Sequence, residues 1–348
     1  MTSGARARRV WPVLLVGLVI AACGSNSARV RSSTPVPTLD FPNALGPTSS
    51  LTPAPTPSVA PSHRPTPRST ATPAHRSAPP PARPHVLLIM LENKGYAATL
   101  GSCSADPYLC SLASSNASVV GWTGVSHPSL PNYIAATTGG TQGCSSDTCF
   151  NTLTVRSLGG QLSAAGIPWT AYMESMPSAC YTGQWSGGTG AGALYGEKHD
   201  PFVIAGDVLN NGCASHVLPY PGTSGLTAAL NGANAPDFVW ITPNQLDDMH
   251  SASVTAGDNW LKANIAPVLA SPWFTGGNAT VIVTMDEGPG NTNSIPLVIV
   301  SNNAAGKGNV SLAGNHYGTL RSIEEVFGLS LLGAAQSLAA GDLARYFG

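Results

Sequence analysis

Four short apolar runs stand out in the part of the chain that follows residue 84. Each has the length of a strand, and a continuous apolar run of this length is typical of a strand buried on both faces of a sheet. Helical repeats of apolar residues lie between them and after the last one. The runs are 85–91, 237–242, 280–285 and 295–300, and the helical repeats are 158–165, 257–269 and 317–327. Alternating strands and helices predict an α/β fold, a three-layer sandwich around a mostly parallel central sheet.

Polar clusters come directly after three of these predicted strands. Glu92-Asn93 follows the first, the segment 243–250 follows the second, and Asp286-Glu287 follows the third. In open α/β sheets, ligands bind beyond the carboxyl ends of the strands. We therefore expect these three loops, although far apart in sequence, to meet at one edge of the sheet.

The first 84 residues have a different composition. Arginines at 6, 8 and 9 precede an apolar stretch at 10–20 and a lipobox-like segment that ends at Cys23, as in a bacterial lipoprotein signal peptide, residues 1–23. The alternative is an ordinary secretory peptide with an incidental cysteine. Residues 24–84 are rich in Pro, Ser and Thr, which predicts a disordered stalk. We expect an exported cell-envelope lipoprotein, anchored to the outer face of the membrane through Cys23, with one folded domain at 85–348.

Charge and cysteine content narrow the possible partners. The formal net charge is −1, so no basic field predicts nucleic-acid binding.

Of seven cysteines, all but Cys23 lie in the domain, and an even number in an exported domain suggests disulfides. The pairs closest in sequence are 103–110 and 144–149, which leaves 180–213, although other pairings are possible. A cysteine-based zinc site is the alternative, but the spacings lack CxxC.

The segment 127–133, His-Pro-Ser-Leu-Pro-Asn-Tyr, places a hydroxyl beside a histidine. Its prolines exclude a helix around Ser129, and residues 134–138 would begin one. Ser129 would then lie near a helix N-terminus, where free amides favour an anion such as phosphate. The alternative is a capped turn, and this segment alone does not decide between them. His127 could bind phosphate, act as an acid or fill a structural niche.

Acids and histidines in the strand-end loops are candidate metal ligands. Asp248 and His250 lie two residues apart, and the adjacent acids Asp286 and Glu287 would repel each other unless a cation compensated them. Solvated loop acids are the alternative, but the common position after strands favours a divalent metal. His316 precedes the helix expected at 317–327, and a helix N-terminus keeps a histidine neutral, as a ligand requires.

A further charged segment, 197–202, contains His199 and could hold a phosphate or form a surface ion pair. A hydroxyl nucleophile together with oxygen and imidazole ligands is what metal-assisted phosphoryl transfer needs.

At these residues the chain resembles the phosphoesterase family that contains bacterial secreted acid phosphatases and phosphatidylcholine-type phospholipases C, within the alkaline-phosphatase-like superfamily. The acid phosphatase branch is the nearer likeness, because its H-P-S-x-P-N-Y form occurs here. The matching motifs are 90–96, 126–133, 198–202, 242–250, 284–287 and 315–317.

The resemblance implies a role for each matching position. Ser129 would be the nucleophile. Glu92, Asp286 and Glu287 would share a metal, and Asp248, His250 and His316 would complete a second ligand set or bind phosphate. His127 and His199 would contact phosphate or leaving group. Asn93 would touch the metal site or bind substrate at its phosphate, and Asn132 would bind substrate. Asp200 stands where asparagine is frequent and Gly288 where another acid is common, so the number of metals stays open.

The sequence thus predicts an exported, metal-assisted phosphoesterase that hydrolyses phosphate monoesters of small molecules or lipid headgroups. A phospholipase C and a phosphoinositide phosphatase are alternative enzymes. A binding lipoprotein on a degenerate phosphatase fold is the alternative without catalysis.

Overall fold

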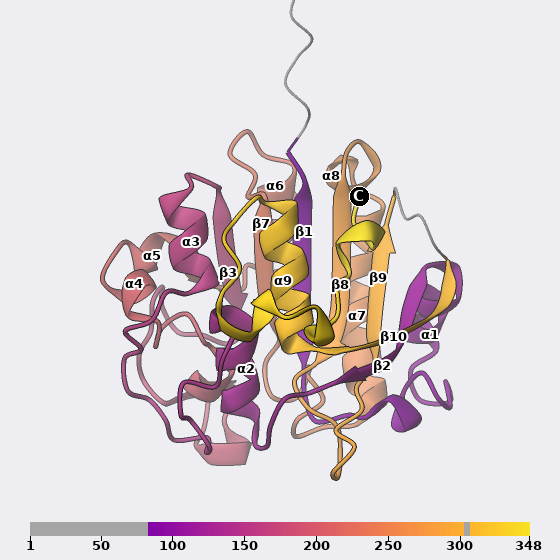
Figure 1. Ribbon diagram of the computed structural model, residues 1–348, viewed down its shortest axis with the longest axis horizontal. Helices are drawn as coiled ribbons and strands as arrows, with labels where there is room; N and C mark the ends of the chain where they lie inside the picture. The colour runs from indigo at the N-terminus through magenta and orange to yellow at the C-terminus, as the bar shows by residue number, and fades with distance from the viewer. Residues whose placement is uncertain (1–82, 303–306) are drawn as a thin grey trace, which may run out of the picture. The chain divides into compact units, whose positions relative to one another are not determined.

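The computed structural model describes residues 83–302 and 307–348. The predicted signal segment, the lipidation site Cys23 and almost all of the predicted stalk lie outside the described residues. Eight strands form one sheet in the order β10-β2-β9-β8-β1-β7-β3-β6, and a two-stranded ribbon pairs β4 with β5 (Figure 1). The strands are β1 His85–Leu91, β2 Ala117–Thr123, β3 Trp169–Met173, β4 Trp185–Ser186, β5 Tyr195–Gly196, β6 Val217–Pro219, β7 Phe238–Thr242, β8 Ala279–Met285, β9 Leu297–Ser301 and β10 Gly308–Asn315.

The centre of the sheet is built from the apolar runs that the sequence predicted as strands. β1 pairs in parallel with β7 on one side and with β8 on the other. All five residues of β7 and all seven of β8 are buried, which explains why neither run shows an alternation of polar residues. β9 runs antiparallel to both β8 and β2. The carboxyl ends of β1, β7 and β8 consequently lie side by side at one edge.

Helices cover both faces of the sheet, which confirms the predicted three-layer architecture. α2, α3 and α9 lie over the face toward the viewer in Figure 1, and α1, α6 and α7 lie behind it. The helices are α1 Pro107–Ser115, α2 Ser129–Thr138, α3 Leu158–Ala164, α4 Gly206–Leu209, α5 Cys213–His216, α6 Gly222–Leu230, α7 Val254–Leu269, α8 Pro272–Thr275 and α9 His316–Val326. None of the helices within 83–302 and 307–348 has the length and apolar character needed to cross a bilayer.

The predicted start of the helix that follows Ser129 is wrong. The prolines at 128 and 131 were expected to exclude a helix at Ser129, but α2 begins at Ser129 itself and includes Pro131. Proline is tolerated in the first turn because the amides there have no partner within the helix. The expectation that Ser129 lies at a helix N-terminus is confirmed, and the helix starts five residues earlier than the sequence suggested.

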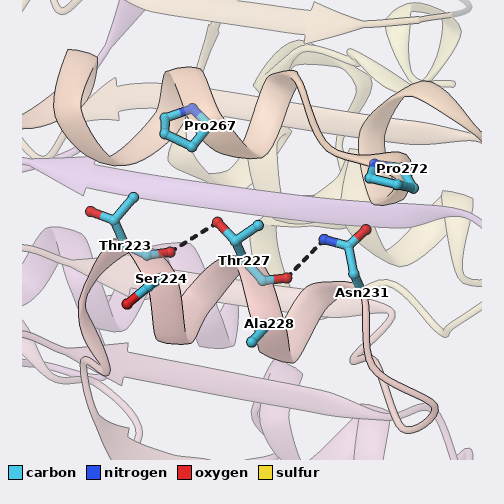
Figure 2. A pocket seen from close by; sticks show the side chains of 7 residues that line it. All are labelled: Thr223, Ser224, Thr227, Ala228, Asn231, Pro267 and Pro272. Atoms are coloured by element: carbon cyan, nitrogen blue, oxygen red, sulfur yellow. Dashed lines mark hydrogen bonds between the residues drawn. The ribbon is translucent and has the colours of Figure 1, made fainter.

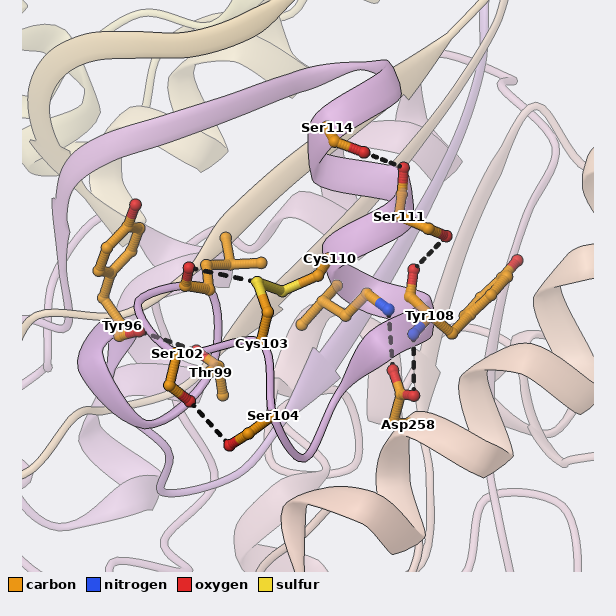
Figure 3. Close-up of a disulfide and its surroundings, with 12 residues drawn as sticks. Tyr96, Thr99, Ser102, Cys103, Ser104, Tyr108, Cys110, Ser111, Ser114 and Asp258 are labelled. Carbon is orange, nitrogen blue, oxygen red and sulfur yellow. Dashed lines mark hydrogen bonds between the residues drawn. A yellow bond between two sulfur atoms is a disulfide. The ribbon is translucent and has the colours of Figure 1, made fainter.

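The three predicted disulfides are confirmed: Cys103–Cys110, Cys144–Cys149 and Cys180–Cys213. Figure 3 shows the first of them at the start of α1. Asp258 of α7 reaches the same helix end, where its carboxylate accepts hydrogen bonds from the amides of Tyr108 and Leu109 (Figure 3). These two amides are unpaired within the helix, so Asp258 supplies the cap that fastens α1 to α7.

Candidate active site

Glu92 is the residue on which the site converges. It follows β1 directly, its side chain is fully buried, and its amide donates to the backbone oxygen of Asp248 at 2.8 Å. Its carboxylate accepts three hydrogen bonds. Ser129 Oγ donates at 3.0 Å, Tyr133 Oη at 2.7 Å and Asn93 Nδ2 at 2.9 Å. The strand end and the start of α2 are therefore joined through one carboxylate.

The loop before Ser129 is held by the side chain of Asn132. Its Oδ1 accepts from the amides of Val125 and Ser126, and its Nδ2 donates to the carbonyls of Ser126 and Pro128. Asn132 is fully buried. The side-chain amide of Asn132 thus holds the loop that fixes the direction of Ser129. A direct contact between Asn132 and substrate stays a prediction.

Asp286, at the end of β8, forms the second wall of the site. Its Oδ1 accepts from the amide of Asn93 at 2.9 Å, and its Oδ2 is buried without a hydrogen-bond partner. Nε2 of His316, at the start of α9, contacts the backbone oxygen of Asp286. His316 is fully buried and its Nδ1 has no partner. It therefore contacts the backbone that carries Asp286, not the Asp286 carboxylate.

His199 lies between the carboxylates of Glu92 and Asp248. The sequence had left a surface ion pair open as the alternative for its segment, 197–202. Its Nε2 is 3.2 Å from Glu92 Oε1 and its Nδ1 is 3.5 Å from Asp248 Oδ2. The ring stacks on Tyr133 with centroids 5.4 Å apart. The surface alternative is wrong, because only 3% of the His199 side chain is exposed.

His250 and a buried lysine complete the inner cluster. The Lys198 ammonium donates to His250 Nε2 at 3.0 Å and to Asp147 Oδ2 at 3.1 Å. The other ring nitrogen of His250 lies 2.9 Å from Ser251 Oγ, which donates to the carbonyl of Ala191. This chain of bonds places the proton of His250 on Nδ1 and leaves Nε2 as an acceptor.

Two predicted site residues lie apart from this cluster. His127 Nδ1 is 2.5 Å from Glu287 Oε2, and His127 Nε2 is 3.2 Å from the carbonyl of Gly290. The His127 side chain is 47% exposed, whereas that of Glu287 is 10% exposed. Glu287 thus faces His127 at the rim, and the adjacent acids Asp286 and Glu287 bind different partners.

Burial shifts the pKa values of the cluster in a consistent direction. Desolvation, followed by repulsion from Asp286 and Asp248, raises the pKa of Glu92 well above its usual range. Desolvation likewise raises the pKa of Asp248, and it brings the pKa of Asp286 to about 6. Desolvation and the neighbouring Lys198 charge lower the pKa of His199 and bring that of His250 to about 4. The imidazoles are therefore neutral, as metal ligands must be.

The donor set fits a divalent cation. Glu92, His199 and His250 each offer a ligand atom, and these atoms lie within 4.8 Å of one another. Asp248 Oδ2 and Asp286 Oδ2 are buried without hydrogen-bond partners. The other oxygen of each accepts from a backbone amide, but neighbouring buried carboxylates still repel one another unless a cation or protons compensate them. Mixed oxygen and imidazole donors suit metals such as Zn²⁺ or Mn²⁺.

Sequence reasoning missed Tyr133, Lys198 and Asp147 as parts of the site. The sequence did contain a signal for Tyr133. It lies four residues after Ser129 in α2, and residues four apart lie on the same face of a helix. Lys198 stood in the charged segment 197–202 but was not singled out. Asp147 gave no signal, since it belongs to a loop whose path the sequence does not fix.

A groove of about 870 Å³ lies at a different place, between α6 and the end of α7 (Figure 2). Thr227 Oγ1 donates to the carbonyl of Thr223 there, and Asn231 Nδ2 donates to that of Thr227. The lining residues are Thr223, Ser224, Thr227, Ala228, Asn231, Pro267 and Pro272, with no titratable group among them. The groove therefore lacks the groups that acid–base or metal chemistry requires.

Known proteins resemble this chain in sequence. The model of the phosphoesterase family matches residues 104–330. A phosphatidylinositol-3-phosphatase of Mycobacterium tuberculosis is 30% identical, over 73% of this chain and 80% of its own. A phosphate-repressible acid phosphatase of Penicillium chrysogenum is 29% identical, over 70% of this chain and 59% of its own. An acid phosphatase of Aspergillus fumigatus is 29% identical, over 57% of this chain and 43% of its own. The chain thus spans about half the length of these two fungal relatives.

Solved structures show the same fold at low sequence identity. A protein of the alkaline phosphatase superfamily from Vibrio parahaemolyticus has a TM-score of 0.52 and 11% identity, over 73% of this chain and 70% of its own. Murine ectonucleotide pyrophosphatase/phosphodiesterase 5 has a TM-score of 0.52 and 11% identity, over 76% of this chain and 100% of its own. The fold is therefore alkaline-phosphatase-like. The family match and the curated relatives together show that the chain belongs to the phosphoesterase family and is a hydrolase of phosphoric esters.

Proposed function

We propose that the domain at 85–348 is a metal-dependent phosphomonoesterase of the acid phosphatase type, with Ser129 as its nucleophile. The observation that carries this proposal is the hydrogen bond from Ser129 Oγ to Glu92, at the start of α2 and beside the buried acids. Ser129 lies at the positive end of the α2 dipole, which favours a phosphate group, although the Leu130 amide already donates to Asp147 and Pro131 has no N–H. The acid phosphatases among the curated relatives support a monoester substrate.

The residues that would hold the metal are Glu92, Asp248 and Asp286, with His199 as a nitrogen donor. His250 would join them through Nε2, which would then exchange its hydrogen bond from Lys198 for the metal. A bound divalent cation neutralises phosphate charge and lowers the pKa of a coordinated hydroxyl. This proposal assigns His199 to the metal as a ligand, whereas the sequence predicted that it would contact the phosphate or the leaving group. His316 would support Asp286 through its backbone contact.

The chain's own groups would position the reacting atoms. Glu92 accepts the Ser129 hydrogen bond and so orients Oγ for in-line attack on phosphorus, and water then hydrolyses the phosphoserine. Lys198 supplies a buried positive charge for the phosphate oxygens. His127 lies half-exposed at the rim beside Glu287, and it would protonate the leaving oxygen once its Nε2 leaves the Gly290 carbonyl. Asn93 orients two acids, through its side chain to Glu92 and its amide to Asp286.

The proposal is tested with p-nitrophenyl phosphate and a p-nitrophenyl phosphocholine diester, each with and without a chelator. We expect hydrolysis of the monoester, loss of activity on chelation and its return with added metal. Ser129→Ala should abolish turnover, by about a thousandfold or more, while the circular dichroism spectrum stays unchanged. Faster hydrolysis of the diester would favour a phospholipase C, and wild-type rates in Ser129→Ala would contradict the nucleophile assignment.

A phosphoinositide monoester is the second candidate substrate. The observation that favours it is the 30% identity to a phosphatidylinositol-3-phosphatase, of which the chain covers 80%. Vesicles that carry a phosphatidylinositol monophosphate, compared with the soluble headgroup, test it through phosphate release. Equal rates on both would argue against recognition of a lipid surface.

We also propose that the protein is exported and lipid-anchored through Cys23. The support is the signal-like sequence at 1–23 and the three disulfides of the domain, which fit an oxidising compartment. Metabolic labelling with a radioactive fatty acid tests this proposal. The label should disappear in Cys23→Ala, and persistence of the label would contradict the site.

A further inference from the structure

The carboxylate of Asp147 bridges two groups that border the reacting serine. Its Oδ1 accepts from the amide of Leu130, the residue after Ser129, at 3.0 Å. Its Oδ2 accepts from Lys198 Nζ at 3.1 Å. Asp147 thus joins the first turn of α2 to the buried lysine of the segment Glu197–His199.

Lys198 lies between Asp147 and the acidic cluster. Its side chain is only 8% exposed, and its charge acts on the carboxyls of Glu92 and Asp248. Lysine carries its ammonium on a flexible four-carbon stem, and the ammonium binds as a point charge. Its direction is fixed by two partners, the Asp147 carboxylate at 3.1 Å and His250 Nε2 at 3.0 Å, and of these only Asp147 carries a negative charge.

Asp147 is well suited to supply that charge because its own loop is closed. It lies between Cys144 and Cys149, whose disulfide joins residues five apart, and Cys144 is buried. A short cross-linked loop has few conformations, so little ordering entropy is lost in presenting the carboxylate. The Asp147 side chain is 31% exposed, so part of its surface remains in solvent.

We propose that Asp147 is a positioning residue, which holds Lys198 aimed at the substrate phosphate and fastens it to the helix turn that carries Ser129. This inference rests on the proposed function, since Lys198 is assigned there to the phosphate oxygens. Asp147 acts through Lys198 and does not touch the reacting atoms. In Asp147→Asn the side-chain oxygen can still accept from the Leu130 amide, so this change should matter only as long as Lys198 is present.

A double-mutant cycle with Asp147→Asn and Lys198→Met tests this dependence. Both kcat/KM on p-nitrophenyl phosphate and the inhibition constant of inorganic phosphate are measured. Asp147→Asn should lower kcat/KM about tenfold and weaken phosphate inhibition by a similar factor, the size usual for one charged hydrogen bond. In the Lys198→Met background the same change should alter either quantity less than about twofold. Thr148→Ala, an exposed neighbour in the same loop, is the matched control and should behave as wild type.

Two results would overturn the inference. Additive losses in the cycle would show that Asp147 does not act through Lys198. Tighter phosphate inhibition in Asp147→Asn would show that the carboxylate competes with phosphate for the same donors. If Asp147→Asn fails to fold, the pair Cys144→Ser and Cys149→Ser frees the loop and keeps the carboxylate, and the same dependence on Lys198 is expected. An inactive wild-type protein would instead count against the proposed function.

Discussion

The Ser129 hydroxyl donates a hydrogen bond to the carboxylate of Glu92 across 3.0 Å, although the two residues are 37 positions apart in sequence. One lies at the carboxyl end of the central strand β1 and the other at the first residue of α2. Both side chains are buried. The bond places the Ser129 hydroxyl oxygen beside the buried acids Glu92, Asp248 and Asp286. Electrostatic interactions are stronger in such a buried site than in solvent.

Tyr133→Phe should disturb this arrangement without removing any charge. The phenol donates to Glu92 Oε1 at 2.7 Å, and both groups are fully buried. Loss of this bond leaves a buried polar group with one partner fewer, which should lower the free energy of unfolding by about 2 kcal/mol. We also expect kcat to fall about tenfold, because Glu92 loses one of the bonds that orient it. Urea unfolding and steady-state kinetics measure the two effects.

Tyr108→Phe is the matched control for that substitution. The Tyr108 hydroxyl is buried and has no hydrogen-bond partner. Its removal should leave activity unchanged and the free energy of unfolding unchanged or higher. If Tyr133→Phe proved as harmless as Tyr108→Phe, the phenol would have no part in holding Glu92.

Metal binding should release protons and strengthen as the pH rises. Burial brings the pKa of Asp286 to about 6 and also raises those of Glu92 and Asp248 well above their usual range, so the metal-free cluster carries protons in mildly acidic solution. A metal must displace these protons, and below those pKa values its apparent affinity should rise about tenfold per pH unit for each proton released. Titration calorimetry with Mn²⁺ in buffers of different ionisation enthalpy counts the protons. Affinity that falls with rising pH would contradict this assignment of the ligands.

The disulfides should differ in their contribution to stability according to the loop that each closes. Cys180–Cys213 closes a separation of 33 residues, whereas Cys144–Cys149 closes one of 5. Loop-closure entropy predicts a loss of about 3.5 kcal/mol when the first pair is replaced by serine and about 2 kcal/mol for the second. Urea unfolding of the two variants measures the difference. An equal or reversed order would show that native-state contacts outweigh loop entropy here.

Glu324 should give stability a pH dependence that is separate from the metal site. Desolvation raises its pKa to about 7, although its carboxylate accepts from the Leu332 amide. Because the folded state holds this proton more tightly than the unfolded state, the contribution is complete below the ordinary pKa of about 4.5 and is lost as the pH rises through about 7. Glu324→Gln should therefore lose less stability than wild type between these limits in chelator-treated protein. Identical pH profiles of the urea midpoint would refute this role.

Fold prediction succeeded where burial leaves a continuous apolar run. β1, β7, β8 and β9 are buried on both faces, so their sequences are apolar throughout. β10 was missed because it alternates between partly buried and exposed positions. Short polar alternation of this kind also occurs in loops, so the pattern alone does not identify an edge strand.

Site prediction succeeded where position along a strand fixes position in space. Glu92 and Asp286 directly follow β1 and β8, so the parallel pairing of these strands brings them together. Asp147 reaches the site from a disulfide-closed loop and Lys198 from the short 3₁₀ helix Glu197–His199, and the positions of both depend on tertiary contacts. No local pattern encodes such positions, which is why the lysine and its partner were not predicted.

The most direct test of the central claim is acid quenching during turnover, followed by mass spectrometry of the peptide that contains Ser129. Wild-type protein with metal and p-nitrophenyl phosphate should show one phosphoryl group on Ser129, and chelated protein should show none. A covalent phosphate on any other residue, or full turnover with an unmodified Ser129 peptide at every quench time, would contradict a pocket in which this serine is the attacking group.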